Sequence, residues 1–195
     1  MKKILVALII FSSIAIERAN AQLQRGNILV GGDLADFNLG LNKNSNFIMT
    51  IDPTAAWFIK DNLAVGAYVL LGVDAVKGST TTTYGVGPIA RYYLGTNQVN
   101  TESLLRHTRA FVEGNVGIEG SNTSHGSSTN GLGLGIGPGI AYFVTPNIGL
   151  EALLKYKGIV GFGNDPLNSR LDLSVGFQIY LPGRATQNRV SNDAK

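Results

Sequence analysis

Six charged residues stand out in this sequence because each lies in a strand-length run with regularly spaced apolar residues. They are Arg91, Glu113, Glu151, Lys155, Arg170 and Asp172. Paired carboxylates can act as general acid and base, and a row of charges can also line an ion-conducting path. A third interpretation is structural, because an unpaired buried charge costs several kcal/mol and charges removed from water must therefore pair. We expect the structural interpretation, a network of charges that neutralise one another.

A serine-rich stretch, SNTSHGSST, places His125 beside Ser124, Ser127 and Ser128. A histidine can activate a hydroxyl only when nucleophile, base and orienting acid lie within hydrogen-bond reach. The low-complexity composition of the stretch gives no sign of such order, so we do not expect an enzyme. His107 is the other histidine and cysteine is absent, so we expect no metal site, and we expect no cofactor.

The glycine-rich run GLGLGIGPG invites comparison with a nucleotide-binding loop. No register of the run fits the G-x-G-x-x-G pattern of such loops. Its glycines recur at every second residue, as they would on one face of a β-strand. The run therefore predicts a strand with one face that allows close packing.

The six charged residues and the glycine-rich run lie on strand-length segments that are separated by turn signals. This pattern is typical of an antiparallel all-β protein. Each run exceeds the roughly 9 to 11 residues that a tilted strand needs to cross a bilayer. The eight runs are Gly26 to Leu39, Asn46 to Ile59, Leu63 to Val76, Thr82 to Leu94, Arg109 to Gly120, Gly131 to Val144, Ile148 to Ile159 and Ser169 to Leu181.

The stretch SRLDLSVGFQIYL shows how the two faces of such strands differ, since apolar residues alternate with polar or small ones. In a soluble barrel the apolar row is the core, whereas in a membrane barrel it faces lipid and the polar row lines the interior. Here the second row is mostly Gly, Ala and Ser, and charged residues form only 15% of the chain, against about 25% in soluble domains. We therefore expect the apolar row to face lipid.

The charges on the inward row include both signs, so they can pair inside a narrow lumen. They are Asp33, Asp52, Asp74, Arg91, Glu113, Glu119, Glu151, Lys155, Lys157, Arg170 and Asp172. The sequence thus predicts an all-β fold, an eight-stranded antiparallel up-and-down transmembrane β-barrel, with strand one joined to strand eight because lipid leaves no partner for a free sheet edge.

The connections predict which rim is which. Tight turns at Lys60-Asp61-Asn62 and Thr145-Pro146-Asn147 define one rim, the periplasmic one in such barrels. The other rim carries four longer segments, and the long connection from 95 to 108 departs from this rule. The four segments are Leu41 to Ser45, Val76 to Thr81, Ser121 to Asn130 and Val160 to Asn168.

Aromatic residues gather at the strand ends that share the periplasmic rim. Trp57, Tyr92, Tyr142 and Tyr180 all occupy such positions. Amphipathic rings favour the membrane–water interface, so we expect these four residues to form an aromatic girdle.

The first 21 residues have the features of a signal peptide: two lysines, a short apolar run and Ala19-Asn20-Ala21 before Gln22. We expect residues 22–181 to form the barrel domain and residues 182–195 a polar, disordered tail. Without the signal, thirteen basic and twelve acidic residues leave a net charge of +1. This balance offers no basic face for nucleic acid, which we do not expect as a partner.

The runs GVGPIARYYLG, RAFVEGNVGIEG, GLGIGPGIAYFVTPNIGLEALLKY and LDLSVGFQIYL resemble those of the small eight-stranded outer-membrane β-barrels common in Bacteroidetes, relatives in architecture of OmpX and OmpA. The resemblance covers the mature chain and implies residence in a Gram-negative outer membrane, with outer-membrane lipid and the barrel assembly machinery as partners. The family usually ends at an aromatic residue that this machinery recognises. Here Tyr180-Leu181 is followed by the tail, which leaves that signal internal.

The expected function is a structural or surface-interaction role through the four outer loops, with a closed interior and an unidentified extracellular ligand. Three alternatives stay open at this point. They are a narrow, porin-like passive pore, an enzyme acting on lipid or protein at the membrane rim, and a soluble lipocalin-like barrel that binds an apolar ligand.

Overall fold

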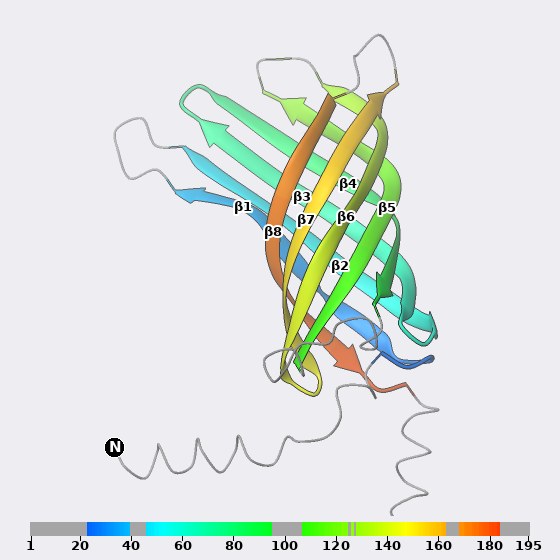
Figure 1. The fold of residues 1–195 in the computed structure, drawn as a ribbon. Coiled ribbons are helices and arrows are strands. Elements are labelled where there is room, and N and C mark those ends of the chain that lie inside the picture. The colour runs from blue at the N-terminus through cyan, green and yellow to red at the C-terminus, as the bar shows by residue number, and fades with distance from the viewer. Residues whose placement is uncertain are drawn as a thin grey trace, which may run out of the picture.

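The chain folds into eight antiparallel strands that form one closed barrel in sequence order (Figure 1). The computed structural model describes residues 23–39, 46–94, 107–124, 126, 128–162 and 168–183. Several expectations fall outside this range: those for the signal peptide, the segment 41–45, the connection 95–106, His125, Ser127, residues 163–167 and the tail beyond residue 183. The strands are β1 (Ile28–Leu39), β2 (Phe47–Lys60), β3 (Leu63–Val76), β4 (Ser79–Tyr93), β5 (Thr108–Thr123), β6 (Thr129–Thr145), β7 (Ile148–Gly161) and β8 (Asn168–Leu181). The described residues include no helix long and apolar enough to span a membrane.

The strands close into a barrel with a stagger of ten residues. The stagger is found by starting at Ile28 on β1 and moving from each residue to its partner on the next strand. This path passes through Tyr156 on β7 and ends at Leu171 on β8. β1 itself, however, pairs Ile28 with Leu181, ten residues further along β8. A stagger of this size goes with strands that tilt roughly 35–45° from the barrel axis, and an eight-stranded barrel has an interior just wide enough for side chains to fill it.

Alternation along each strand sorts apolar side chains to the outside and small or polar ones to the lumen, as the sequence predicts. On β6, for example, Leu134 and Ile136 are 47% and 61% exposed, whereas Gly133 is buried and faces inward. Thirty-three large hydrophobic residues of the described chain are exposed, far more than a soluble surface tolerates as one continuous belt. This inside-out arrangement is that of a transmembrane barrel and contradicts the lipocalin-like alternative, in which apolar side chains fill the interior.

The turns confirm one half of the expected rim pattern. β2 and β3 are joined by Asp61 and Asn62, with Asn62 at φ 65°, a left-handed conformation that asparagine adopts more readily than most residues. β6 and β7 are joined by Pro146 and Asn147. At the opposite rim, however, β3 and β4 are joined by only two residues, Lys77 and Gly78.

The expected long loop from Val76 to Thr81 is therefore wrong. Gly78 takes φ 87° and reverses the chain at once, and the threonines that follow pair with β3, because β-branched residues suit a pleated strand. The expected loop from Ser121 to Asn130 is likewise shorter, since β5 runs to Thr123 and β6 begins at Thr129.

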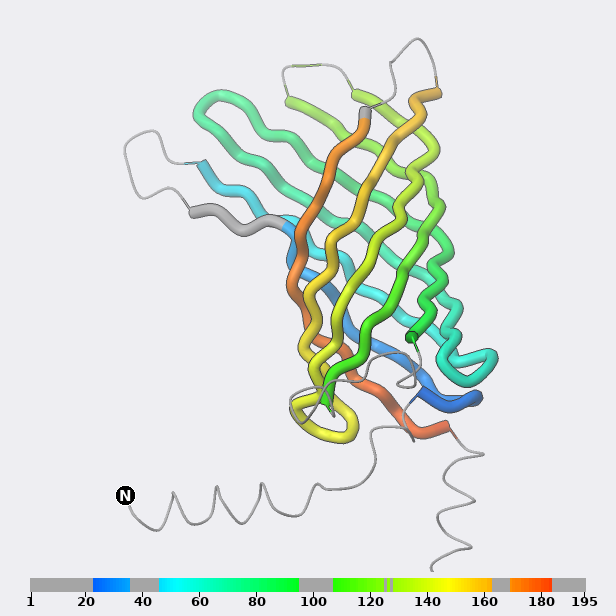
Figure 2. The backbone as a smooth tube through the Cα atoms, in the orientation of Figure 1, coloured from blue at the N-terminus to red at the C-terminus, as the bar shows by residue number. Residues whose placement is uncertain are grey.

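Residues 23–27 fold across the lower end of the barrel before β1 begins. The backbone amide of Asn62 donates a hydrogen bond to the carbonyl of Leu23 at 2.7 Å, and the amide of Gly183 donates to Asn27 Oδ1 at 3.0 Å. The first and last described segments therefore meet at this rim (Figure 2). Leu23 is only 3% exposed, so its side chain closes the lower mouth of the lumen.

Substituting Ile136→Arg tests the lipid-facing assignment of the outer row. Ile136 lies in the middle of β6 and is 61% exposed, so the charge will meet hydrocarbon and lower the free energy of unfolding in lipid vesicles by about 2–4 kcal/mol. Phe162→Arg, directly after the last residue of β7, is the matched control and should cost only about 0–1 kcal/mol. Urea titration of the refolded proteins measures both values, and an Ile136→Arg protein as stable as wild type contradicts the assignment.

Candidate functional site

The centre of the lumen is occupied by an ion-pair network around Arg91. Arg91 Nε and Nη2 lie 2.8 and 2.5 Å from Glu113 Oε2, and Arg91 Nη1 lies 2.7 Å from Glu151 Oε2. Lys155 Nζ adds a further ion pair with Glu113 Oε1 at 2.5 Å. All four side chains are at least nine-tenths buried, so each charge depends on its partners for stabilisation.

The strand register explains how these residues meet. Arg91 on β4 and Glu113 on β5 are directly paired across neighbouring strands. Glu151 lies on β7 and reaches Arg91 across the lumen. Lys155, also on β7, reaches Glu113 on β5. The network thus ties three separate strands together through the interior.

The glycines of GLGLGIGPG provide the space that the network needs. A Cβ atom at Gly133 would overlap the carboxyl group of Glu119, one at Gly135 would overlap the amide of Asn115, and one at Gly139 would overlap the ring of Phe111. The inward face of β6 is therefore left free for side chains from β5. The expectation that these glycines allow close packing is confirmed.

Arg170 and Asp172 belong to a second, separate ion-pair group. Arg170 Nε lies 3.0 Å from Asp172 Oδ1, and Lys157 Nζ lies 3.5 Å from both Asp172 Oδ2 and Asp52 Oδ2. The side chain of Arg170 is 51% exposed, in contrast to the buried groups around Arg91. The six sequence-predicted charges are therefore divided between two groups, four in the first and two in the second.

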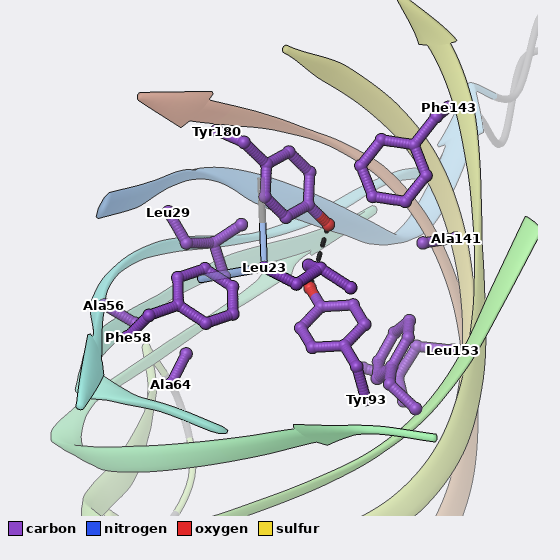
Figure 3. Packing of buried hydrophobic residues seen from close by; sticks show 11 residues of the cluster. Leu23, Leu29, Ala56, Phe58, Ala64, Tyr93, Ala141, Phe143, Leu153 and Tyr180 are labelled. Carbon is purple, nitrogen blue, oxygen red and sulfur yellow. Dashed lines mark hydrogen bonds between the residues drawn. The ribbon is translucent and has the colours of Figure 1, made fainter. Parts of the chain in front are cut away.

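Tyr180 is not part of an outer aromatic girdle, so this expectation is wrong. The residue is 1% exposed and points into the lumen, where its hydroxyl donates to Glu151 Oε1 at 2.9 Å and lies 2.8 Å from the hydroxyl of Tyr93 (Figure 3). The reason is parity, because Tyr180 shares the inward row of β8 with Ser174 and Gln178. Trp57, Tyr92 and Tyr142 do lie on the outside and are 49–55% exposed.

An aromatic layer fills the lumen below the ion pairs. The rings of Tyr93 and Phe111 are 5.4 Å apart and those of Phe143 and Tyr180 are 4.9 Å apart, within the range of favourable aromatic pairs. Figure 3 shows Leu23 in the middle of this layer, next to the Tyr93–Tyr180 hydrogen bond. The guanidinium of Arg91 lies 4.4 Å from the ring centre of Phe111, so a cation–π contact joins the two layers.

Sequence reasoning missed Tyr93 and Lys157 as network members. Tyr93 accepts a hydrogen bond from Arg91 Nη1 at 3.2 Å, and its position two residues after Arg91, on the same row, was the signal available. Lys157 lies on the predicted inward row, and its ion pair with Asp52 joins β7 to β2. No local pattern in the sequence indicates a contact between strands so far apart.

The arrangement is suited to holding the barrel together and closing it. The two carboxylates of Glu113 and Glu151 are balanced by the two cations Arg91 and Lys155. The described residues contain no group of three or more His, Cys, Asp or Glu side chains placed to hold a metal ion. His107, the described histidine, lies beside the outer ring of Tyr142, with ring centres 6.4 Å apart.

An inward polar row, an outward apolar row and full closure define the class of transmembrane β-barrels. Solved structures with this fold are similar to the chain. Neisserial surface protein A (NspA) has a TM-score of 0.52 at 20% identity, over 78% of this chain and 95% of that one. The N-terminal β-barrel domain of Pseudomonas aeruginosa OprF has a TM-score of 0.51 at 14% identity, over 80% and 98%.

A third structure, the outer membrane protein OprG from Pseudomonas aeruginosa, has a TM-score of 0.50 at 13% identity, over 83% of this chain and 98% of that one. At sequence identities of 13–20%, the structural similarity to these three proteins establishes the fold of the chain. No protein-family model matches the sequence, and no curated protein matches it. The Bacteroidetes-type relationship stays a prediction.

Replacing Arg91 by Met tests whether the buried network stabilises the barrel. The change leaves Glu151 without a cation, and we expect the free energy of unfolding to fall by about 3–5 kcal/mol. The double variant Arg91→Met, Glu151→Gln should restore most of this loss, because Glu113 keeps its ion pair with Lys155.

Arg170→Met is the matched control for this experiment. Arg170 is half exposed, so its removal should change stability by about 0–1 kcal/mol. Equilibrium unfolding in lipid vesicles measures all three variants. If Arg91→Met and Arg170→Met cost the same, the central network is not the stabilising element.

Proposed function

We propose that this protein is a closed outer-membrane β-barrel that acts through its externally exposed turns and loops. Outer-membrane lipid surrounds it, the barrel assembly machinery inserts it, and its export depends on the N-terminal signal. Its apolar outer belt, its fold neighbours and the charge pattern of its lumen all support this role. The Bacteroidetes-type affiliation belongs to the same proposal, as does the absence of catalysis.

The single observation that carries the proposal is the filled lumen. Arg91, Glu113 and Glu151 bridge the centre, the Tyr93–Tyr180 hydrogen bond crosses the layer below, and Leu23 covers the lower mouth. Side chains in these positions occupy the path that water and ions need. A barrel closed in this way offers its outer surface and rim, rather than a channel, for interaction.

The exposed aromatic residues support the same placement in a membrane. Trp57, Tyr92 and Tyr142 lie on the outer surface near the strand ends that meet the β2–β3 and β6–β7 turns. Rings in this position suit the interface between hydrocarbon and the aqueous periplasm. We propose these three residues as the periplasmic girdle, which places the β3–β4 turn on the extracellular side.

Conductance in planar lipid bilayers tests the closed interior. We expect the inserted wild-type protein to give no discrete current steps, because the bridging side chains block the lumen. Closure depends on the ion-pair bridge, on the Tyr93–Tyr180 layer below it and on Leu23 at the lower mouth. We therefore expect conduction from a variant in which all six side chains are truncated to alanine, namely Arg91, Glu113, Glu151, Tyr93, Tyr180 and Leu23. Insertion is verified for both proteins by the mobility shift between unboiled and boiled gel samples, and reproducible steps from the wild type would support the pore alternative.

Single cysteines test the orientation, since the natural chain contains none. Lys77→Cys lies in the β3–β4 turn and Asn147→Cys in the β6–β7 turn. A maleimide polymer too large to cross the outer membrane should label Lys77→Cys in intact cells and leave Asn147→Cys unlabelled until the cells are permeabilised. The reverse labelling pattern overturns the orientation, and protection of both sites overturns surface exposure.

A further inference from the structure

The seam between β1 and β8 is the shortest in the barrel wall. These strands pair from Ile28–Leu181 to Leu34–Val175, over seven residue pairs, whereas each other pair of neighbours is matched over 11 to 14. The register of β1 then shifts at a bulge between Leu34 and Asp36. Beyond it, β1 and β2 lean away from β8 (Figure 1), and β8 from Asn168 to Ser174 has no partner on β1.

A groove of 840 Å³ lies along this seam. Its volume falls within the roughly 300–1,000 Å³ of small-molecule sites. Most of its side chains come from the outward rows of four neighbouring strands, so it is lined by hydrocarbon and faces the lipid. The apolar side chains that line it are Val30, Leu34, Ile51, Pro53, Leu150, Val175, Phe177 and Ile179.

A carboxylate without an ion pair lies just inside the seam. Asp33 is paired with Gly176, one step below the last matched pair of the seam, and belongs to the residues that line the groove. It is 6% exposed, and its Oδ1 accepts no hydrogen bond from any described residue. Among the described residues Asp33 forms no ion pair, whereas the neighbouring acidic residues Asp52 and Glu151 pair with Lys157 and Arg91.

We propose that the β1–β8 seam binds an amphiphile with one linear hydrocarbon chain and a primary ammonium group. The chain occupies the apolar groove, and the ammonium passes through the gap above Leu34–Val175 to reach the carboxylate of Asp33. This binding site goes beyond the surface role proposed above, and it does not require an open lumen.

The charges around the seam select the ammonium group. A buried carboxylate is stabilised by a cation that donates hydrogen bonds to it. An anionic head group would instead meet Asp33, Asp52 and Glu151, since the basic residues that act on Asp33, Arg91 and Lys155, are already ion-paired with Glu151 and Glu113. A neutral alcohol can donate a hydrogen bond but leaves the carboxylate charge uncompensated.

Photochemical labelling in lipid nanodiscs tests the site. Dodecylamine carrying a diazirine on its chain is irradiated with the refolded full-length protein, and mass spectrometry maps the labelled residues. We expect labels to concentrate on β1 and β8 beside the groove, and excess unlabelled dodecylamine to suppress them. Dodecanol should compete weakly, and dodecanoate should not compete.

Two pairs of variants isolate the two halves of the site. Asp33→Asn keeps the shape of the side chain and should weaken competition by dodecylamine at least about tenfold. Asp74→Asn changes a carboxylate on β3 that lies outside the groove, and it should leave this competition unchanged. Val175→Trp should block the groove, whereas Val112→Trp, outward on β5, should leave labelling intact. Gel mobility before boiling shows which variants are folded.

Three results would overturn the proposal. They are labels spread evenly around the barrel, labelling that Asp33→Asn leaves unchanged in a folded protein, and dodecanoate that competes as well as dodecylamine. A chain that fails to insert into nanodiscs at all would instead contradict the membrane assignment, so the two failures are distinguishable.

Discussion

The structure depends on one constraint: inside a lipid bilayer, every backbone N–H and C=O group must find its partner within the protein. A sheet satisfies this demand by joining its last strand to its first, as β8 joins β1 here. With eight strands and a stagger of ten residues, closure leaves an interior only wide enough for side chains. The size of the lumen, and therefore its content, follows from the pairing of the backbone.

A narrow lumen determines which side chains can fill it. Large groups on one strand require small groups on the next, which is the relation between Phe111 on β5 and Gly139 on β6. Charged groups require opposite charges within reach, which Arg91 provides for Glu113 and Glu151. Closure of the interior is thus a consequence of satisfying packing and charge together, and the external rim is left as the surface available for interaction.

The period-two pattern of the sequence was enough to predict the eight strands and their two faces, because side-chain direction alternates residue by residue. The pattern is ambiguous after Gly78, because a run of polar threonines resembles a loop in the sequence and forms a strand in the structure. Tyr180 lies inside because parity along the strand, and not position at the strand end, decides which way a side chain points. The contact between Lys157 and Asp52 could not be predicted, because it depends on the register of strands that are distant in sequence.

The β1–β8 seam differs from the other seven interfaces for a topological reason. Each of those joins strands consecutive in sequence, so closing the chain between them costs little conformational entropy when the turn is short. β1 and β8 have no such link and are held by strand pairing, over seven residue pairs, and by the hydrogen bond from Gly183 to Asn27 below it. The bulge at Leu34/Asp36 redirects β1 where that pairing ends. An opening in the wall therefore disrupts the fewest backbone contacts at this seam. Asp33 lies at the edge of the opening, because it is the inward carboxylate that directly precedes the bulge on β1.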